Sequence, residues 1–179
     1  MNLKRLIKNF ILDKSQRLLE IPYIGPNLNS GCIWPKLANP FKLLLTAFLV
    51  IIILEKLPPC GFKNWLYRKF LGVEVGKDVV IGPKVWLDPL FPQLITIEDG
   101  AIIGCGSRIL THEFLINAVR IGRVHIGRQS LIGSFSTVRS GITIGEGSII
   151  GMMSFVNKDV PDKARVGGVP IKPIKINRQ

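Results

Sequence analysis

Two histidines are the side chains in this sequence best suited to moving a proton near neutral pH, and one of them stands where a site would form. His112 lies in Ile109-Leu110-Thr111-His112-Glu113, where a regular repeat gives way to an irregular loop. A histidine there is either an outward corner residue or a general base, and its place at the root of a loop favours the base. Glu113 or a backbone carbonyl would then hold the imidazole tautomer. His125 directly precedes the next repeat and is expected to be a surface or loop residue.

Asp88 is the second side chain with chemical potential. It lies in Trp86-Leu87-Asp88-Pro89, at an earlier interruption of the same repeat. It would bind substrate hydroxyl groups or support the histidine, or it would be a turn aspartate that accepts backbone N–H groups. The sequence leaves these roles open.

A six-residue repeat is the element that must position these side chains. Between Ile126 and Pro161 every block of six opens on a β-branched aliphatic residue, and four of the six blocks continue with glycine. A fixed short period of this kind predicts a parallel β-helix. One aliphatic side chain per block would point into a narrow core, and the glycine would free the backbone to turn each corner. Three blocks would make one triangular coil, and coils would stack through main-chain hydrogen bonds.

The repeat begins earlier and is interrupted twice. An irregular stretch containing Pro89 and Pro92 forms the first interruption, and roughly Glu113 to His125 forms the second. This predicts about four coils with two insertions. Pro161 is expected to end the pattern, and residues 162–179 to return along the outside. The earlier blocks open at Val75, Ile81, Leu87, Ile97, Ile103 and Ile109.

Length and charge favour one domain, residues 73–179, behind a basic N-terminal segment, residues 1–72. The 179 residues carry a net charge of +12, of which +8 lies in residues 1–72. Aromatic residues are not interleaved with basic ones in any RNA-binding pattern, so a nucleic-acid partner is not expected. The charge instead favours an anionic membrane surface, with simple solubility as the alternative.

The cysteines predict neither a disulfide framework nor a metal site. Cys32, Cys60 and Cys105 show no C-x-x-C spacing and no histidines at metal-ligand spacing. Three reduced thiols in a cytoplasmic protein are expected, and no secretory signal is visible because charges run through Met1 to Glu20.

The first helix expected is basic and amphipathic. Apolar residues from Leu3 to Ile11 recur near helical spacing, with lysine and arginine largely on the other face. Such a helix would lie in a membrane interface or pack on protein, and the sequence does not decide between them. Residues 21–40 are rich in proline and glycine and are expected to form an irregular connector.

Leu43 to Leu54 is an uncharged apolar run of about 18 Å as a helix, short of a hydrocarbon core of about 30 Å. Basic residues flank both sides, Lys63 among them, so the positive-inside rule gives no orientation. If the domain that follows uses a cytoplasmic cofactor, a true span would place the basic N-terminus outside. A monotopic segment at the cytoplasmic face of the cell membrane is therefore favoured over a single-pass span. Residues 62–71, which mix aromatic and basic side chains, predict a second interfacial helix.

The repeat region resembles the left-handed β-helix hexapeptide-repeat acyltransferases, in the branch that O-acetylates sugars and xenobiotics. Residues 142–151 (ITIGEGSIIG), 157–161 (NKDVP) and 166–170 (VGGVP) carry the resemblance, which covers about residues 75–175. It implies an all-β fold, namely a left-handed parallel β-helix preceded here by membrane-associating helices. It also implies a homotrimer with active sites between subunits, acetyl-CoA as donor, and no required metal.

The resemblance also implies roles for single residues. His112 matches the histidine that deprotonates the acceptor hydroxyl, and Asp88 matches an acid common in related proteins. Ser134 matches a serine near the pantetheine arm, while Lys158 and Lys175 match basic residues that face the nucleotide phosphates.

Several positions depart from the family pattern. Met152, Met153 and Phe135 replace small residues that flank the groove for the donor arm, and Asn157 replaces a threonine. Bulk there would narrow the groove or change which donor fits.

The function expected is transfer of an acetyl group to a sugar or lipid-linked glycan during polysaccharide or glycolipid synthesis. Transfer from an acyl-carrier protein, whose acidic surface suits a basic partner, and a non-catalytic trimeric scaffold are the alternatives. A zinc carbonic anhydrase on the same fold would need three histidines, and the chain has two.

Overall fold

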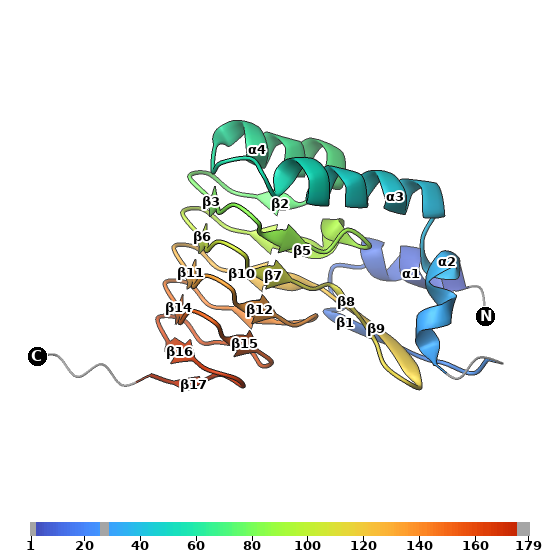
Figure 1. Ribbon diagram of the computed structural model, residues 1–179. Helices are drawn as coiled ribbons and strands as arrows, with labels where there is room; N and C mark the ends of the chain where they lie inside the picture. Colours follow the sequence, from blue (N-terminus) through green and yellow to red (C-terminus); the bar gives the residue numbers. More distant parts are fainter. Residues whose placement is uncertain (1–2, 26–28, 175–179) are drawn as a thin grey trace, which may run out of the picture.

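Short parallel strands stack into three flat sheets that together form a β-helix (Figure 1). The computed structural model describes residues 3–25 and 29–174. The first sheet contains β2 (Glu74–Val75), β5 (Ile95–Ile97), β10 (Val124–Ile126) and β13 (Thr143–Ile144). The second contains β3 (Val80–Ile81), β6 (Ile102–Ile103), β11 (Leu131–Ile132), β14 (Ile149–Ile150), β16 (Arg165–Gly167) and β17 (Lys172–Pro173). The third contains β4 (Trp86–Leu87), β7 (Arg108–Ile109), β12 (Thr137–Val138) and β15 (Phe155–Val156).

The core of the β-helix consists of three stacks of aliphatic side chains, one for each sheet. In the second sheet Ile81, Ile103, Ile132 and Ile150 are paired in register, and each is 0% exposed. The aliphatic residues that open the predicted blocks are paired in the same way in the other two sheets. The predicted period, its phase and the four coils with two insertions are therefore confirmed.

The glycines that follow the core residues have a different purpose from the one expected. A Cβ atom on Gly104 would lie 2.5 Å from the Ser134 nitrogen, and one on Gly133 would lie 2.5 Å from the Met152 nitrogen. Positive φ angles occur instead in the turns, and non-glycine residues such as Phe135 (60°) occupy several of them. The prediction that these glycines turn corners is wrong, because their role is to let neighbouring coils approach closely.

The stack continues beyond Pro161, where it was expected to end. Val160 forms a parallel bridge to Ile144, and β16 pairs in parallel with β14. Val160, Val166 and Ile171 are buried and extend the core by a further partial coil. β17 then pairs antiparallel with β16. A proline does not stop a β-helix at a corner, because the amide there needs no ladder partner.

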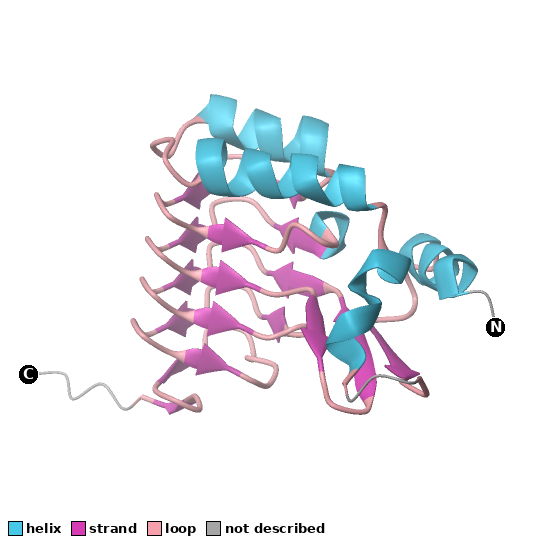
Figure 2. Ribbon diagram, turned by 45° about the vertical axis from the view of Figure 1, so that its right-hand side comes forward, coloured by secondary structure: helices cyan, strands magenta, loops and turns pink. Residues whose placement is uncertain are grey.

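Two helices lie side by side across the end of the β-helix that holds the first coil (Figures 1 and 2). The first is α3 (Pro40–Phe48), which continues as the π-helical segment η2 (Leu49–Leu54). The second is α4 (Gly61–Leu66), which continues as the π-helical segment η3 (Tyr67–Leu71). One face of the pair enters the core of the first coil and closes it, with buried side chains at Val50, Leu54, Leu66, Tyr67 and Leu71.

Lys63 is fully buried between this helix pair and the first coil. Its ammonium group donates to the carbonyl oxygens of Leu57 (3.1 Å), Ile81 (3.1 Å) and Gly82 (2.8 Å). The first coil has no preceding strand to pair with, so its carbonyl groups need such donors. The prediction that Lys63 is one of the basic residues flanking a membrane segment is therefore wrong.

Burial lowers the pKa of Lys63 from its ordinary value of 10.5 to about 8. Between these pH values the unfolded chain binds a proton that the folded chain has lost, so this group's contribution to stability improves as pH rises. From pH 7 to 9.5 wild type should gain on the order of 2 kcal/mol relative to Lys63→Met. Urea unfolding of both proteins at each pH measures this difference, and a pH-independent difference would contradict it.

Part of the N-terminal segment packs on the β-helix domain. α1 (Leu3–Leu12) forms as expected, and Ile7 and Phe10 are buried in a second apolar cluster with Leu90, Phe91 and Ile121. Of the two alternatives, packing on protein is therefore the one observed. The expected connector contains η1 (Ser30–Ile33) and α2 (Trp34–Leu37).

The strand β1 (Leu18–Pro22) was not expected from the sequence. It pairs antiparallel with β9 (Ala118–Gly122) in the second insertion, and β9 also pairs with β8 (His112–Phe114). This strand depends on a partner about a hundred residues away, so local helical spacing gave no sign of it. Within the described residues no single helix is long and apolar enough to cross a bilayer. One pair, Ser30–Leu37 with Pro40–Leu54, reaches that length and composition only together, across a bend of 94°.

Candidate active site

His112 opens β8, immediately after the third sheet of the second coil. Successive side chains of a strand point to opposite faces, so His112 and Phe114 share one face of β8 and Glu113 lies on the other. The first insertion, which carries Asp88 and the short helix η4 (Pro92–Leu94), lies beside it. The two interruptions of the repeat therefore meet at one place.

A buried carboxylate holds the imidazole ring of His112. The Asp88 side chain is 0% exposed, and its Oδ2 lies 2.6 Å from His112 Nδ1. Asp88 also accepts the backbone N–H groups of Leu90 (2.9 Å), Thr111 (2.9 Å) and His112 (3.1 Å). The turn role and the histidine contact, left open by the sequence, thus occur together. With its Nδ1–H donated to Asp88, a neutral imidazole has Nε2 left to accept a proton.

Two aromatic rings fix the imidazole from the sides. Phe114 meets it edge-on at a centroid distance of 5.1 Å, and Phe91 does so at 6.4 Å. The His112 side chain remains 18% exposed. The ring is therefore held in place yet reachable, as a base needs to be. Sequence reasoning missed both phenylalanines, although Phe114, two residues after His112, would be found from strand alternation.

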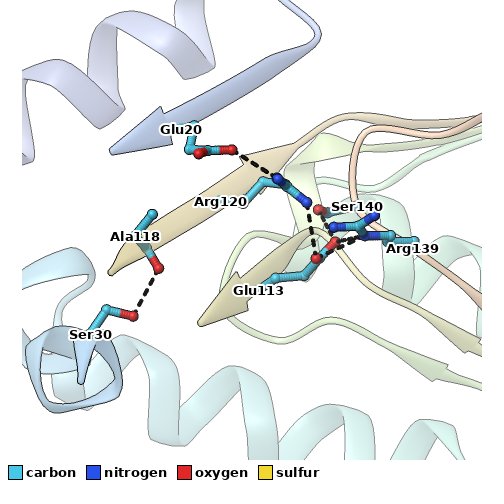
Figure 3. Close-up of polar contacts among 7 residues, drawn as sticks. All are labelled: Glu20, Ser30, Glu113, Ala118, Arg120, Arg139 and Ser140. Carbon is cyan, nitrogen blue, oxygen red and sulfur yellow. Dashed lines mark hydrogen bonds and ion pairs between the residues drawn. The ribbon is translucent and has the colours of Figure 1, made fainter. Parts of the chain in front are cut away.

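The Glu113 side chain anchors the second insertion through contacts with Arg139, Ser140 and Arg120 (Figure 3). Its carboxylate accepts from Arg139 Nε (2.9 Å to each oxygen) and from Ser140 Oγ (2.6 Å), and Arg120 Nη1 lies 3.5 Å away. Arg120 also pairs with Glu20 of β1 at 2.9 Å. The expectation that Glu113 orients the histidine is wrong, because alternation along β8 places its side chain on the opposite face.

The residues expected to bind the donor border the third sheet. Ser134 and Met152 lie in the turns that precede β12 and β15, and the Met153 N–H donates to the Ser134 carbonyl at 2.9 Å. Asn157 and exposed Lys158 follow β15, at the edge of the sheet where β7 leads to His112. The structure thus places these four around one flat face. Within the described residues none of them has a hydrogen bond to His112, and Lys175 lies outside those residues.

The bulky departures from the repeat pattern stand on the outside of one corner. Met152, Met153 and Phe135 are 68%, 69% and 61% exposed. The Phe135 ring covers Gly106 of the preceding coil, where a Cβ atom would lie 2.5 Å from Phe135 Cδ1. His125 is on another face, 41% exposed, with Nε2 3.4 Å from Glu98 Oε1.

An apolar pocket of about 360 Å³ opens beside His112. Its wall includes α3, Trp34 of α2, Leu90 of the first insertion and Phe114 of β8. The Thr46 hydroxyl of α3 donates to the Pro89 carbonyl at 3.0 Å and fixes the helix against this loop. Sequence reasoning treated α3 only as a membrane segment and so missed its place at the site.

Comparison with other sequences gives one match to a repeat family and several to individual relatives. Residues 123–158 match the family described as bacterial transferase hexapeptide (six repeats). YvoF, a predicted acetyltransferase of Bacillus subtilis (strain 168), is 43% identical over 135 residues, which cover 75% of this chain and 78% of YvoF. SAS0727, a predicted acetyltransferase of Staphylococcus aureus (strain MSSA476), is 35% identical over 131 residues, which cover 73% of this chain and 81% of SAS0727.

Solved structures with the same fold include the hexapeptide-repeat acetyltransferase VCA0836 of Vibrio cholerae complexed with acetyl coenzyme A. Its TM-score is 0.64 at 21% identity, covering 79% of this chain and 91% of that one. A galactoside acetyltransferase in complex with coenzyme A has a TM-score of 0.60 at 22% identity, covering 76% and 80% of the two chains. A maltose O-acetyltransferase of Clostridium difficile 630 has a TM-score of 0.59 at 22% identity, covering 78% and 88%. At these identities the likeness shows the fold alone.

Proposed function

Because the chain belongs to the hexapeptide-repeat acetyltransferase family, we propose that it transfers an acetyl group from acetyl-CoA to a hydroxyl of a sugar or lipid-linked glycan. The observation that carries this proposal is the contact between His112 Nδ1 and the buried Asp88 carboxylate. Sugar acetyltransferases among the structures of the same fold support the acceptor class.

His112 acts as the general base in this proposal. Its Nε2 takes the proton of the acceptor hydroxyl while the hydroxyl oxygen attacks the thioester carbonyl carbon. As the tetrahedral intermediate collapses, the C–S bond breaks, and the imidazolium returns the proton to the departing sulfur. Asp88 keeps Nδ1 protonated throughout and stabilises the transient positive charge on the ring.

The donor lies along the third sheet in this proposal, between neighbouring subunits of a homotrimer. Ser134, Met152, Asn157 and Lys158 border that sheet in the described residues, and Lys175 is expected to contact the nucleotide. A glycan acceptor would place this reaction in polysaccharide biosynthesis.

An acyl-carrier protein is the alternative donor, and the exposed bulk of Phe135, Met152 and Met153 is the observation that favours it. Calorimetric titration of the purified protein with acetyl-CoA and with acetylated acyl-carrier protein separates the two. Micromolar binding of acetyl-CoA is expected. Binding of the carrier protein alone would overturn the donor assignment, and binding of neither by a folded trimer would favour a scaffold.

We further propose that the helix pair holds the protein on the cytoplasmic face of the cell membrane as a monotopic anchor. The face of the pair that turns away from the β-helix carries large apolar side chains beside the exposed bases Lys42, Lys56 and Lys69. Apolar side chains flanked by basic ones favour an anionic interface over a second protein surface. The apolar face of α1 is not part of this anchor, because Ile7 and Phe10 are buried against the protein. The exposed large apolar residues of the pair are Phe41, Leu44, Leu45, Phe48, Ile51, Ile52, Ile53, Phe62, Trp65 and Phe70.

Replacing both Phe62 and Trp65 with glutamate should weaken vesicle binding at least tenfold, because two stacked aromatic rings leave the interface and two negative charges enter it. Flotation with vesicles containing phosphatidylglycerol measures the bound fraction. Phe135→Glu is the matched control, since Phe135 is as exposed as Phe62 but lies on the β-helix. Equal losses in both variants, or none in either, would contradict the anchor.

A further inference from the structure

The pocket beside His112 is apolar almost throughout. Its wall includes Trp34, Leu43, Leu44, Ala47, Leu90 and Phe114, and His112 is the one readily titratable side chain among its lining residues in the described chain. A sugar ring or the amide groups of a pantetheine arm would lose hydrogen bonds to water there without gaining partners. The pocket therefore suits a hydrocarbon group.

The pocket shares lining residues with the apolar face of the helix pair. Leu44 lines it and is nevertheless 69% exposed, next to exposed Phe41, Leu45 and Phe48 on α3. With the helix pair on a bilayer, as proposed above, a hydrocarbon chain would reach His112 over apolar side chains. This continuity favours a lipid of that bilayer as the occupant.

We propose that the pocket holds the part of an acceptor's hydrocarbon chain nearest to its hydroxyl-bearing headgroup, so that the substrate is a membrane amphiphile and not a free sugar. This inference rests on the proposed function, since it takes His112 as the base for the acceptor hydroxyl and the helix pair as the membrane anchor. In this arrangement the hydrocarbon chain of the acceptor lies against α3. Its headgroup extends past Phe114 toward Nε2 of His112.

A homologous series of n-alkyl glucosides, from methyl to octyl and below their micelle concentrations, tests the pocket. The protein is kept in nanodiscs, because detergent tails would compete for the same space. kcat/KM for acceptor-dependent CoA release should rise roughly fourfold for each methylene until the chain extends beyond the pocket. Values that do not change with chain length, with measurable turnover, would overturn the pocket and leave the proposed function standing.

Two adjacent leucines provide a matched pair of variants. Leu44→Gln should flatten the chain-length series, whereas Leu45→Gln should keep its slope, because Leu45 is 60% exposed on the same helix but does not line the pocket. Ala47→Phe, which fills the pocket, should flatten the series as well. Equal slopes in all three variants would overturn the assignment. The proposed function itself would be contradicted if no glucoside stimulated the release of CoA from acetyl-CoA. It would also be contradicted if stimulated release persisted in His112→Ala.

Discussion

Replacement of His112 by alanine is expected to lower kcat for acetyl transfer by roughly 10²–10⁴-fold, the usual contribution of a positioned general base. The loss should fall on kcat more than on acetyl-CoA binding, since the imidazole acts on the acceptor proton. Initial rates of thiol release in the presence of an acceptor, together with calorimetric titration of the donor, separate these two effects.

His125→Ala is the control for this experiment. It removes the other histidine, which is 41% exposed and lies beside Glu98, so it should leave kcat close to wild type. A His112→Ala protein that melts like wild type and turns over at a similar rate would exclude His112 as the base.

Replacement of Asp88 by asparagine should have the next largest effect, a loss of roughly 10²–10⁴-fold in kcat. A neutral amide no longer stabilises the imidazolium. If its NH₂ group turns toward Nδ1, it also favours the tautomer with the proton on Nε2, which cannot act as a base. Because Asp88 accepts three backbone N–H groups, the variant should also melt at a lower temperature.

Glu113→Gln is the control for Asp88→Asn. It distinguishes loss of the productive His112 tautomer from general damage to the second insertion. Glu113 is charged, adjacent to His112 and bonded to Arg139 and Ser140, but it lies on the other face of β8. Its replacement should reduce the free energy of unfolding by about 1–3 kcal/mol and change kcat much less than Asp88→Asn does. Equal losses of kcat in the two variants would show that Asp88 acts only through the fold.

The coil architecture was predictable because its determinants recur at short range. A β-branched residue every six positions leaves one register for the core, and Ile81, Ile103, Ile132 and Ile150 lie in it. The role predicted for the glycines, turning corners, was wrong. They allow a neighbouring coil to approach, and that contact joins residues about eighteen or more positions apart, such as Gly133 and Met152, so local sequence does not reveal it.

The parts that the sequence did not predict depend on contacts between distant segments. β1 exists because β9 has an edge to pair, and Lys63 is buried because the first coil has unpaired carbonyl groups. For the site, His112 and Asp88 were both named as candidates, but which acid contacts the ring depended on the alternation of β8. A strand had not been predicted there, so Glu113 remained a candidate for that contact.

The most direct test of the account is to count, in one reaction, the CoA thiol released and the O-acetyl ester formed from acetyl-CoA and an alkyl glucoside. We expect one ester for each thiol, with both dependent on the acceptor and both lost in His112→Ala. Thiol release without ester, or ester formation that persists in His112→Ala, would contradict it.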